Sequence, residues 1–154
     1  MLWWGMQPEI LRLGESIRGV LQALLAASGA SLERPMSIVR VLGVDKTLAS
    51  RSAKAARAAE PLSALLSSPA PAGLEALAAA AEGKGVAKEA VEELRAVAVR
   101  LEGMIGSIPG GRSGMDSMIA GWLPEEREGR SRAARQMVHK GMASLLNVTV
   151  DAAY

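Results

Sequence analysis

The sequence predicts an all-α fold, a bundle of short helices, and three observations lead to this class. The chain has no phenylalanine and only four aromatic residues, whereas sheet sandwiches depend on aromatic and β-branched residues. Its many alanines and leucines favour helices that pack closely together. Apolar residues recur at intervals of three and four, with prolines and glycines between the runs. A length of 154 residues and a hydrophobic content of 49% fit one globular domain, or at most two small helical ones.

The N-terminal part should begin with two helices separated by a short break. The first spans residues 8–27, because Pro8 suits a first turn and Gly29 provides a stop. Its predicted buried stripe consists of Ile10, Leu13, Ile17, Val20 or Leu21, and Leu24. The second helix spans residues 35–42 and should end at Gly43, since glycine commonly follows the last turn of a helix.

A third helix should run from Asp45 to about Ala59. The Asp45 carboxylate can accept the free amide groups of the first turn, and Glu60 followed by Pro61 ends the helix. The elements predicted after it are a short apolar segment at 62–66, a hinge at 67–71, helices at 73–82, 87–105, 116–122 and 125–146, and a tail of weak strand character at 147–154. The hinge, with the sequence Ser-Ser-Pro-Ala-Pro, is the best internal boundary.

The net charge of +2 is too small to indicate a partner, but basic residues concentrate in one segment. Residues 33–57 hold six lysines and arginines against two acids, whereas residues 74–102 hold four against six. No acid occurs between Asp45 and Glu60, the residues that bound the third predicted helix. A surface of this kind suits a phosphate backbone, because carboxylates repel phosphates while lysine and arginine release counterions on contact.

The third predicted helix separates its polar and small residues onto two faces when it is drawn at about 100° per residue. One face holds Lys46, Thr47, Ser50, Arg51, Lys54, Arg57 and Ala58. The other face holds Leu48, Ala49, Ser52, Ala53, Ala55 and Ala56. We expect the second face to lie close against neighbouring helices and the first to face solvent or a partner.

The segment Leu42-Gly43-Val44-Asp45-Lys46-Thr47-Leu48-Ala49-Ser50-Arg51 resembles the turn and recognition helix of helix-turn-helix transcription regulators. The lac repressor family shows a similar Gly-Val, a side chain that caps the helix, and Ser-Arg six residues after the valine. In this comparison Gly43 makes the turn, Ile38 and Leu42 are inward residues of the supporting helix, and Ala49 is buried in the recognition helix. The resemblance covers residues 35–56 only. Two positions depart from the family pattern: Val39 stands where a small residue is usual, and Ser52 where an aliphatic one is usual.

This resemblance implies that double-stranded DNA is the partner and that the start of the recognition helix enters the major groove. The residues expected to face the base edges are Lys46, Thr47, Ser50 and Arg51, and those expected to contact phosphates are Ser37, Arg40, Lys54 and Arg57. The chain would then divide into a helix-turn-helix DNA-binding region at 1–66 and a helical support or dimerisation region at 67–154, or form one continuous domain.

The sequence offers no convincing enzyme site, metal site or cofactor site. It has no cysteine and a single histidine, His139, which leaves no pair of histidines for a metal. The glycines of residues 108–115 lack the Gly-Lys-Ser or Gly-Lys-Thr of a phosphate loop. No signal peptide is recognised, and no stretch approaches the roughly 18 uncharged apolar residues of a membrane span. We therefore expect a cytoplasmic protein that is not an enzyme and has no membrane partner.

We expect the protein to act as a homodimer, because one recognition helix contacts only a few base pairs. Two apolar seams have the length to form the interface. The favoured seam is Ile10, Leu13, Ile17 and Leu24, extended by Leu2, Trp3 and Trp4, and the other is Leu94, Leu101 and Ile105. The alternative is that both seams are buried within one chain.

Two other functions fit the same sequence. The main rival to a sequence-specific DNA-binding regulator is a helical oligomerisation or protein-interaction module with a degenerate helix-turn-helix. Acids from the rest of the fold that pair with Lys46, Arg51 and Lys54 would favour this module. A third interpretation is a fragment of an enzyme whose chemistry lies beyond Tyr154. No small-molecule effector is indicated.

Overall fold

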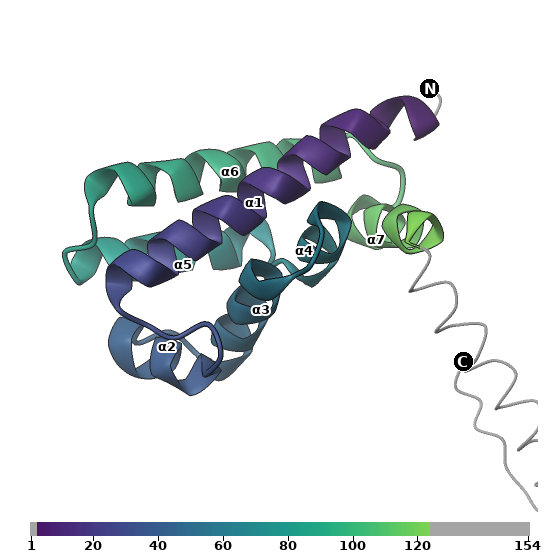
Figure 1. Ribbon diagram of the computed structural model, residues 1–154. Coiled ribbons are helices and arrows are strands. Elements are labelled where there is room, and N and C mark those ends of the chain that lie inside the picture. Colours follow the sequence, from purple (N-terminus) through teal and green to yellow (C-terminus); the bar gives the residue numbers. More distant parts are fainter. Residues whose placement is uncertain (1–2, 124–154) are drawn as a thin grey trace, which may run out of the picture. The chain divides into compact units, whose positions relative to one another are not determined.

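A computed structural model describes residues 3–123, and within that range the chain forms seven α-helices and no strand, so the predicted all-α class is confirmed (Figure 1). After a short 3-10 helix at Trp3–Met6, the helices are α1 (Gln7–Ser28), α2 (Pro35–Leu42), α3 (Lys46–Arg57), α4 (Pro61–Ser67), α5 (Pro71–Gly83), α6 (Lys88–Gly106) and α7 (Gly111–Trp122). The chain divides after Met115 into two compact units, residues 1–115 and 116–154.

Helix α1 is the centre of the first unit. It contacts α3, α4 and α6, while α5 pairs with α6 and α2 pairs with α3 (Figure 1). The side chains of α1 that are 0–1% exposed are Ile10, Leu13, Ile17, Leu21, Leu24 and Leu25. The predicted stripe is therefore the core of the unit, with Leu21 rather than the half-buried Val20 as its fourth member.

The same burial corrects the expectation that the first helix supplies a dimer seam. The seam residues Ile10, Leu13, Ile17 and Leu24 are covered by helices of the same chain and offer no surface to a second copy. In the other seam, Leu94 and Leu101 are fully buried and Ile105 is half-buried. The described residues of both seams are therefore covered within the chain, which was the alternative, while the side chains of Leu2, Trp3 and Trp4 lie outside the described part.

Helices α1 and α4 approach so closely that a side chain cannot fit between them. A Cβ added at Gly14, in the middle of α1, would lie 2.3 Å from the carbonyl oxygen of Pro61 and 2.8 Å from its carbonyl carbon. Glycine normally weakens a helix interior, but at this position it lets two backbones touch. Gly14 therefore sets the distance between α1 and the start of α4.

The predicted helix boundaries agree with the observed ones to within about two residues, except at the last described helix. The expected helix at 116–122 begins five residues earlier, at Gly111. The glycines around it suggested a loop, yet Gly114 is helical, and a Cβ there would lie 2.0 Å from the carbonyl oxygen of Pro109. The glycine permits a close turn of the backbone, which a rule that treats glycine as a helix breaker misses.

The predicted hinge at 67–71 is a short buried connection between α4 and α5. Ser68 is fully buried and Pro69 is also buried. The guanidinium of Arg112 donates to the carbonyl oxygens of Leu65, Leu66 and Ser68 at 3.2, 3.4 and 2.8 Å, which satisfies carbonyls at the end of α4. The expected division at residues 66/67 therefore falls inside the first unit, where α1 packs against α6.

Several expectations fall outside the described residues. They are the helix at 125–146, the tail at 147–154, the surroundings of His139 and the side chains of Trp3 and Trp4. Among the helices of residues 3–123, none combines the length and apolar character that a membrane crossing requires.

Candidate nucleic-acid interface

The turn between α2 and α3 is short and has a defined geometry. Helix α2 ends at Leu42, and Gly43 adopts a left-handed conformation with φ of 73°, which glycine tolerates without strain. Its N–H donates to the carbonyl oxygen of Val39 at 2.8 Å, while the side chain of Val44 is buried. Only three residues, Gly43, Val44 and Asp45, therefore connect α2 to α3.

Asp45 caps the start of α3 as the sequence predicts. The backbone of Asp45 is extended, and its Oδ1 accepts a hydrogen bond from the N–H of Leu48 at 2.8 Å. Leu48 is 9% exposed and reaches α5, where its Cδ1 would lie 3.2 Å from a Cβ added at Gly73. The cap and this apolar contact together fix the first turn of α3.

The inner face of α3 is the one the sequence predicts. Its buried residues are Leu48, Ala49, Ser52, Ala53, Ala55 and Ala56. On α2, Ile38 and Leu42 point inward with exposures of 0% and 3%. Ser52 has a hydroxyl that is buried without a hydrogen-bond partner. Small side chains let α3 lie close to its neighbours α1, α2 and α4.

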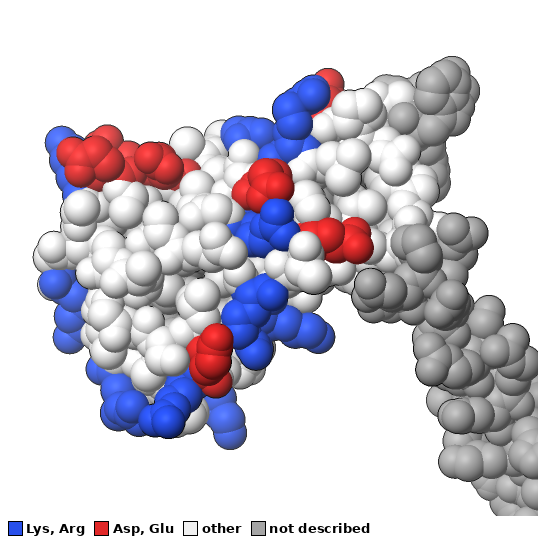
Figure 2. Space-filling model, viewed as in Figure 1, with Lys and Arg blue, Asp and Glu red and all other residues white. Residues whose placement is uncertain are grey.

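The outer face of α3 presents cations and hydroxyls. Lys46, Thr47, Ser50, Arg51, Lys54 and Arg57 are all exposed, as is Arg40 on α2. Seven of the eight predicted DNA-contacting residues therefore lie on the surface of two adjacent helices. In the space-filling view, Lys and Arg gather at the lower left, where α2 and α3 lie, with one acidic residue beside them, whereas a cluster of acids lies at the upper left, where α6 begins (Figure 2).

Ser37, the eighth of these residues, is 8% exposed and its hydroxyl is engaged within the chain. Ser37 Oγ donates to the carbonyl oxygen of Arg34 at 2.8 Å and accepts from the N–H of Ser31 at 2.8 Å. This serine holds the loop before α2 in place, and it is not brought to the surface with the other seven. No pattern in the sequence indicates that its hydroxyl is used in this way.

The cations of α2 and α3 have no acidic partner within the described part of the chain. The ion pairs formed there join Arg18 to Glu15, Lys88 to Glu92, and Arg95 to both Glu75 and Glu82. None of them includes Arg40, Lys46, Arg51, Lys54 or Arg57. The carboxylates nearest in sequence to these five cations are only three, Glu33, the capping Asp45 and Glu60, so the surface keeps an excess of positive charge.

Two arginines of the outer face make weak bonds to backbone carbonyls. Arg51 Nε donates to the carbonyl oxygen of Ser67 at 3.4 Å, and Arg57 Nε donates to that of Ala53 at 3.3 Å. Both distances are long for N–H···O bonds. Because both side chains remain exposed, these bonds orient the guanidinium groups without removing them from the surface.

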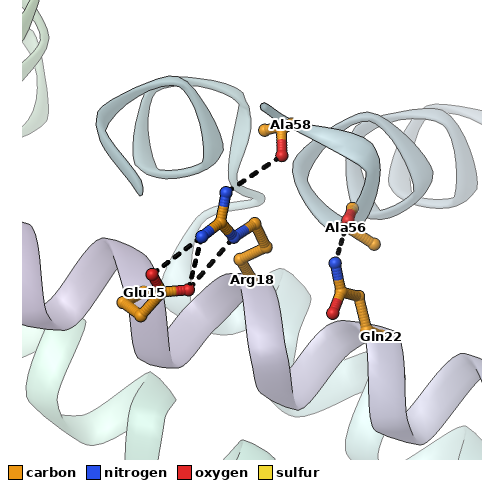
Figure 3. A network of polar contacts seen from close by, with 5 residues as sticks. All are labelled: Glu15, Arg18, Gln22, Ala56 and Ala58. Atoms are coloured by element: carbon orange, nitrogen blue, oxygen red, sulfur yellow. Dashed lines mark hydrogen bonds and ion pairs between the residues drawn. The ribbon is translucent and has the colours of Figure 1, made fainter. Parts of the chain in front are cut away.

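The far end of α3 is held by polar side chains of α1 (Figure 3). Gln22 Nε2 donates to the carbonyl oxygen of Ala56 at 2.8 Å, and Arg18 Nη1 donates to that of Ala58 at 3.2 Å. Arg18 is itself oriented by the carboxylate of Glu15, with bonds of 2.6 and 2.7 Å from Nη2. The last carbonyls of a helix lack partners within it, so these contacts stabilise the end of α3 and tie it to α1.

Sequence reasoning missed Arg18 and Gln22. They are separated by four residues and so lie on one side of α1, beside its buried stripe. That spacing is the only signal the sequence carries, and it does not say which helix lies opposite.

Residues 3–123 contain no group of three or more His, Asp or Glu side chains that could hold a metal ion. Comparisons with protein-family models, with curated proteins and with solved structures found no match to this chain.

Proposed function

We propose that this protein is a sequence-specific DNA-binding protein, a transcription regulator in which α2, the turn and α3 act as a helix-turn-helix. The observation that carries this proposal is the outer face of α3, which is exposed, contains no acid and has no ion-pair partner among the described residues. A solvated helix face in an interaction module normally mixes acids with bases. The absence of neutralising acids therefore favours DNA over the rival function.

The roles of the individual residues follow from their positions on α3. The start of a recognition helix lies nearest the base edges, so Lys46, Thr47, Ser50 and Arg51 would read the major groove. Lysine and arginine can read guanine through its two acceptors. Residues farther from the start, or on the supporting helix, would contact phosphates: Arg40, Lys54 and Arg57. Ser37 is left out of this set because its hydroxyl is already bonded within the chain.

The anchoring of α3 at both ends supports the same role. Asp45 fixes its first turn, and Gln22 and Arg18 hold its last carbonyls. A helix held in this way keeps its backbone in place, so little backbone conformational entropy is lost when DNA binds. Selective reading of a base sequence depends on such preorganisation.

The active form that we propose is a homodimer in the cytoplasm, with a role in binding rather than catalysis. One recognition helix spans only a few base pairs, and a two-fold pair reads two half-sites about 34 Å apart along DNA. The dimer interface has to lie outside the two buried seams described above.

The test is the binding of the full chain to duplex DNA selected from a random pool, near physiological salt. Replacing both Lys46 and Arg51 by alanine should weaken binding to the selected sequence at least tenfold, because each base contact contributes about 1–3 kcal/mol. The matched control replaces Lys84 and Lys88, two exposed lysines outside α2 and α3, and should change the affinity less than twofold.

Two results would contradict the proposal. One is equal affinity of the wild type and the Lys46→Ala/Arg51→Ala variant. The other is no detectable binding to any sequence of the pool at about 0.15 M salt, a condition under which specific DNA-binding proteins retain high affinity.

A further inference from the structure

A groove lies between α1 and α6, two helices of the first unit that pack against each other. It consists of two adjoining hollows of about 410 and 350 Å³, and Arg100 lines both of them. The larger hollow has Glu15, Ser16 and Val20 on its α1 side and Glu93, Val97 and Arg100 on its α6 side. Volumes of this size are typical of sites for small molecules.

Two opposite charges mark the two ends of the larger hollow. Arg100 lies where the hollows meet, and Glu93 precedes it on α6 by seven residues. Seven residues are almost two helical turns, so the two side chains start from the same side of the helix about 10 Å apart. In the smaller hollow, Glu9 and Arg12 bring one acid and one base, which offset each other. The larger hollow therefore has a cationic end and an anionic end.

Glu93 and Arg100 have no charged partner within residues 3–123. Glu93 is exposed and takes part in none of the ion pairs formed there. Arg100 is also exposed, and its Nη1 donates one hydrogen bond, of 3.2 Å, to the hydroxyl of Ser16. That hydroxyl accepts in this bond, so its own hydrogen can be donated to a ligand. Arg100 and Ser16 together suit a carboxylate, and Glu93 suits an ammonium group.

We propose that the larger hollow is a binding site for a small linear zwitterion, with the carboxylate of the ligand on Arg100 and Ser16 and its ammonium group on Glu93. Between these ends, the half-buried Val20 and the buried Val97 provide an apolar surface for a chain of about five carbon atoms. Two valines are too small a surface for a helix of a partner protein, since a specific protein interface buries roughly 1,000 Å² or more. The order of charges therefore favours an ω-amino acid or a compound with the same charge pattern.

Glu15 connects this hollow to the proposed DNA-binding face (Figure 3). It lines the hollow and accepts bonds of 2.6 and 2.7 Å from Nη2 of Arg18, which in turn donates to the carbonyl oxygen of Ala58 beyond the end of α3. An ammonium group near Glu15 competes with Arg18 for this carboxylate and so weakens the hold on α3. We expect the ligand to lower the affinity for DNA, an effect that rests on the function proposed above. By reciprocity, DNA lowers the affinity for the ligand by the same factor.

The test uses the full chain and three probes of equal chain length, ε-aminocaproate, hexylamine and hexanoate. The first carries both charges, and the other two carry one each. NMR titrations of nitrogen-labelled protein report binding through the amide of Gly19, which lines the larger hollow. We expect ε-aminocaproate to bind about threefold more tightly than either of the other probes, because each of them lacks one charged contact at a partly exposed site.

Two substitutions identify which end of the hollow holds which group. Glu93→Gln should make ε-aminocaproate bind no more tightly than hexanoate, and Arg100→Gln should make it bind no more tightly than hexylamine. Damage to the fold cannot produce these two opposite changes. Glu102, an exposed acid of α6 outside the hollow, provides the matched control, and Glu102→Gln should keep the wild-type order of the probes.

DNA binding is measured in a separate titration with the selected duplex. A saturating concentration of ε-aminocaproate should weaken DNA binding by the wild type severalfold. At the same concentration it should leave DNA binding by Glu93→Gln unchanged, because this variant lacks the partner of the ammonium group.

The outcomes separate the ligand site from its link to α3. Equal affinities for the three probes, or no shift of the Gly19 amide at tens of millimolar probe, overturn the ligand site. Retention of the wild-type order of probes in both Glu93→Gln and Arg100→Gln also overturns it. Self-association that Glu93→Gln abolishes would show that a second copy occupies the groove instead. Unchanged DNA affinity with the ligand bound overturns the link to α3 alone, and a chain that binds no DNA leaves the ligand titrations unaffected.

Discussion

The buried hydroxyl of Ser52 gives a prediction for a single residue. An unpaired buried polar group costs about 1–3 kcal/mol, and alanine is also the better helix former. The substitution Ser52→Ala should therefore raise the free energy of unfolding by about 1 kcal/mol. Urea denaturation followed by circular dichroism measures this change.

Ser50 provides the matched control, because it lies in the same helix but is exposed. The substitution Ser50→Ala gains only helix propensity, about 0.5 kcal/mol. A gain from Ser52→Ala no larger than that from Ser50→Ala would show that the buried hydroxyl carries no penalty.

Gly14 and Gly19 give a second matched pair within α1. A Cβ at Gly14 would collide with the backbone of Pro61, whereas nothing lies within 4 Å of a Cβ at Gly19. Gly14→Ala should lower the free energy of unfolding by about 2 kcal/mol, because α1 and α4 have to move apart. Gly19→Ala should raise it by about 0.5–1 kcal/mol through helix propensity. Equal effects of the two substitutions in thermal or urea melts would refute the close approach of α1 and α4.

At the start of α3, two substitutions of the capping Asp45 should affect the stability of the fold and the affinity for DNA differently. Asp45→Ala removes the hydrogen bond to the N–H of Leu48 and should cost about 1 kcal/mol of stability. Asp45→Asn keeps a capping oxygen and should leave stability nearly unchanged. It also removes a negative charge next to the outer face, so its affinity for duplex DNA should rise severalfold at low salt.

Urea melts and fluorescence anisotropy with labelled duplex measure the two quantities for each Asp45 variant. A loss of stability in Asp45→Asn as large as that in Asp45→Ala would contradict the capping role. Unchanged DNA affinity in Asp45→Asn would contradict a contact surface at the start of α3.

For single helices, the sequence predicts correctly those features that depend only on neighbouring residues, such as the buried face and the first turn. The wheel of α3 assigns its buried and exposed residues correctly because a helix with one small apolar face has only one way to pack. Pro8, Pro35 and the capping Asp45 predict the starts of the first three helices for the same reason. Pro61 and Pro71 were expected to end a helix and to lie in a hinge, but they are the first residues of α4 and α5. The start of α7 at Gly111 was missed, because the fit of Gly114 against Pro109 depends on a close contact that no propensity describes.

For the whole molecule, the salt dependence of DNA binding tests which residues contact phosphates and which contact bases. Lys54→Ala removes one proposed phosphate contact, so it should reduce the slope of log affinity against log salt by about 0.9 and weaken binding to all sequences alike. Titrations at four salt concentrations with selected and unrelated duplexes measure both effects. Lys84→Ala, in an exposed residue outside α2 and α3, should leave the slope unchanged. A change of slope in Lys84→Ala equal to that in Lys54→Ala would place the DNA elsewhere.

The contacts between segments that are far apart in the chain could not be predicted from the sequence. Gln22 and Ala56 are 34 residues apart, and Arg18 and Ala58 are 40 apart, so only the packing of α1 on α3 brings them together. The seams of α1 and α6 show the same limit. A pattern of apolar residues marks a face that has to be covered, but it does not say whether the same chain or a second copy covers it.

The contact between Gly14 and Pro61 also bears on how this sequence can vary through evolution. Substitutions that keep the fold are free at Gly19, where space is open, but any side chain at position 14 meets main-chain atoms that a change of sequence at position 61 cannot remove. The same holds for position 114, which lies against the carbonyl of Pro109. We therefore expect glycine at positions 14 and 114 in proteins that descend from a common ancestor with this chain and keep its helix packing, even where the cations of α3 have changed with the DNA sequence to be read.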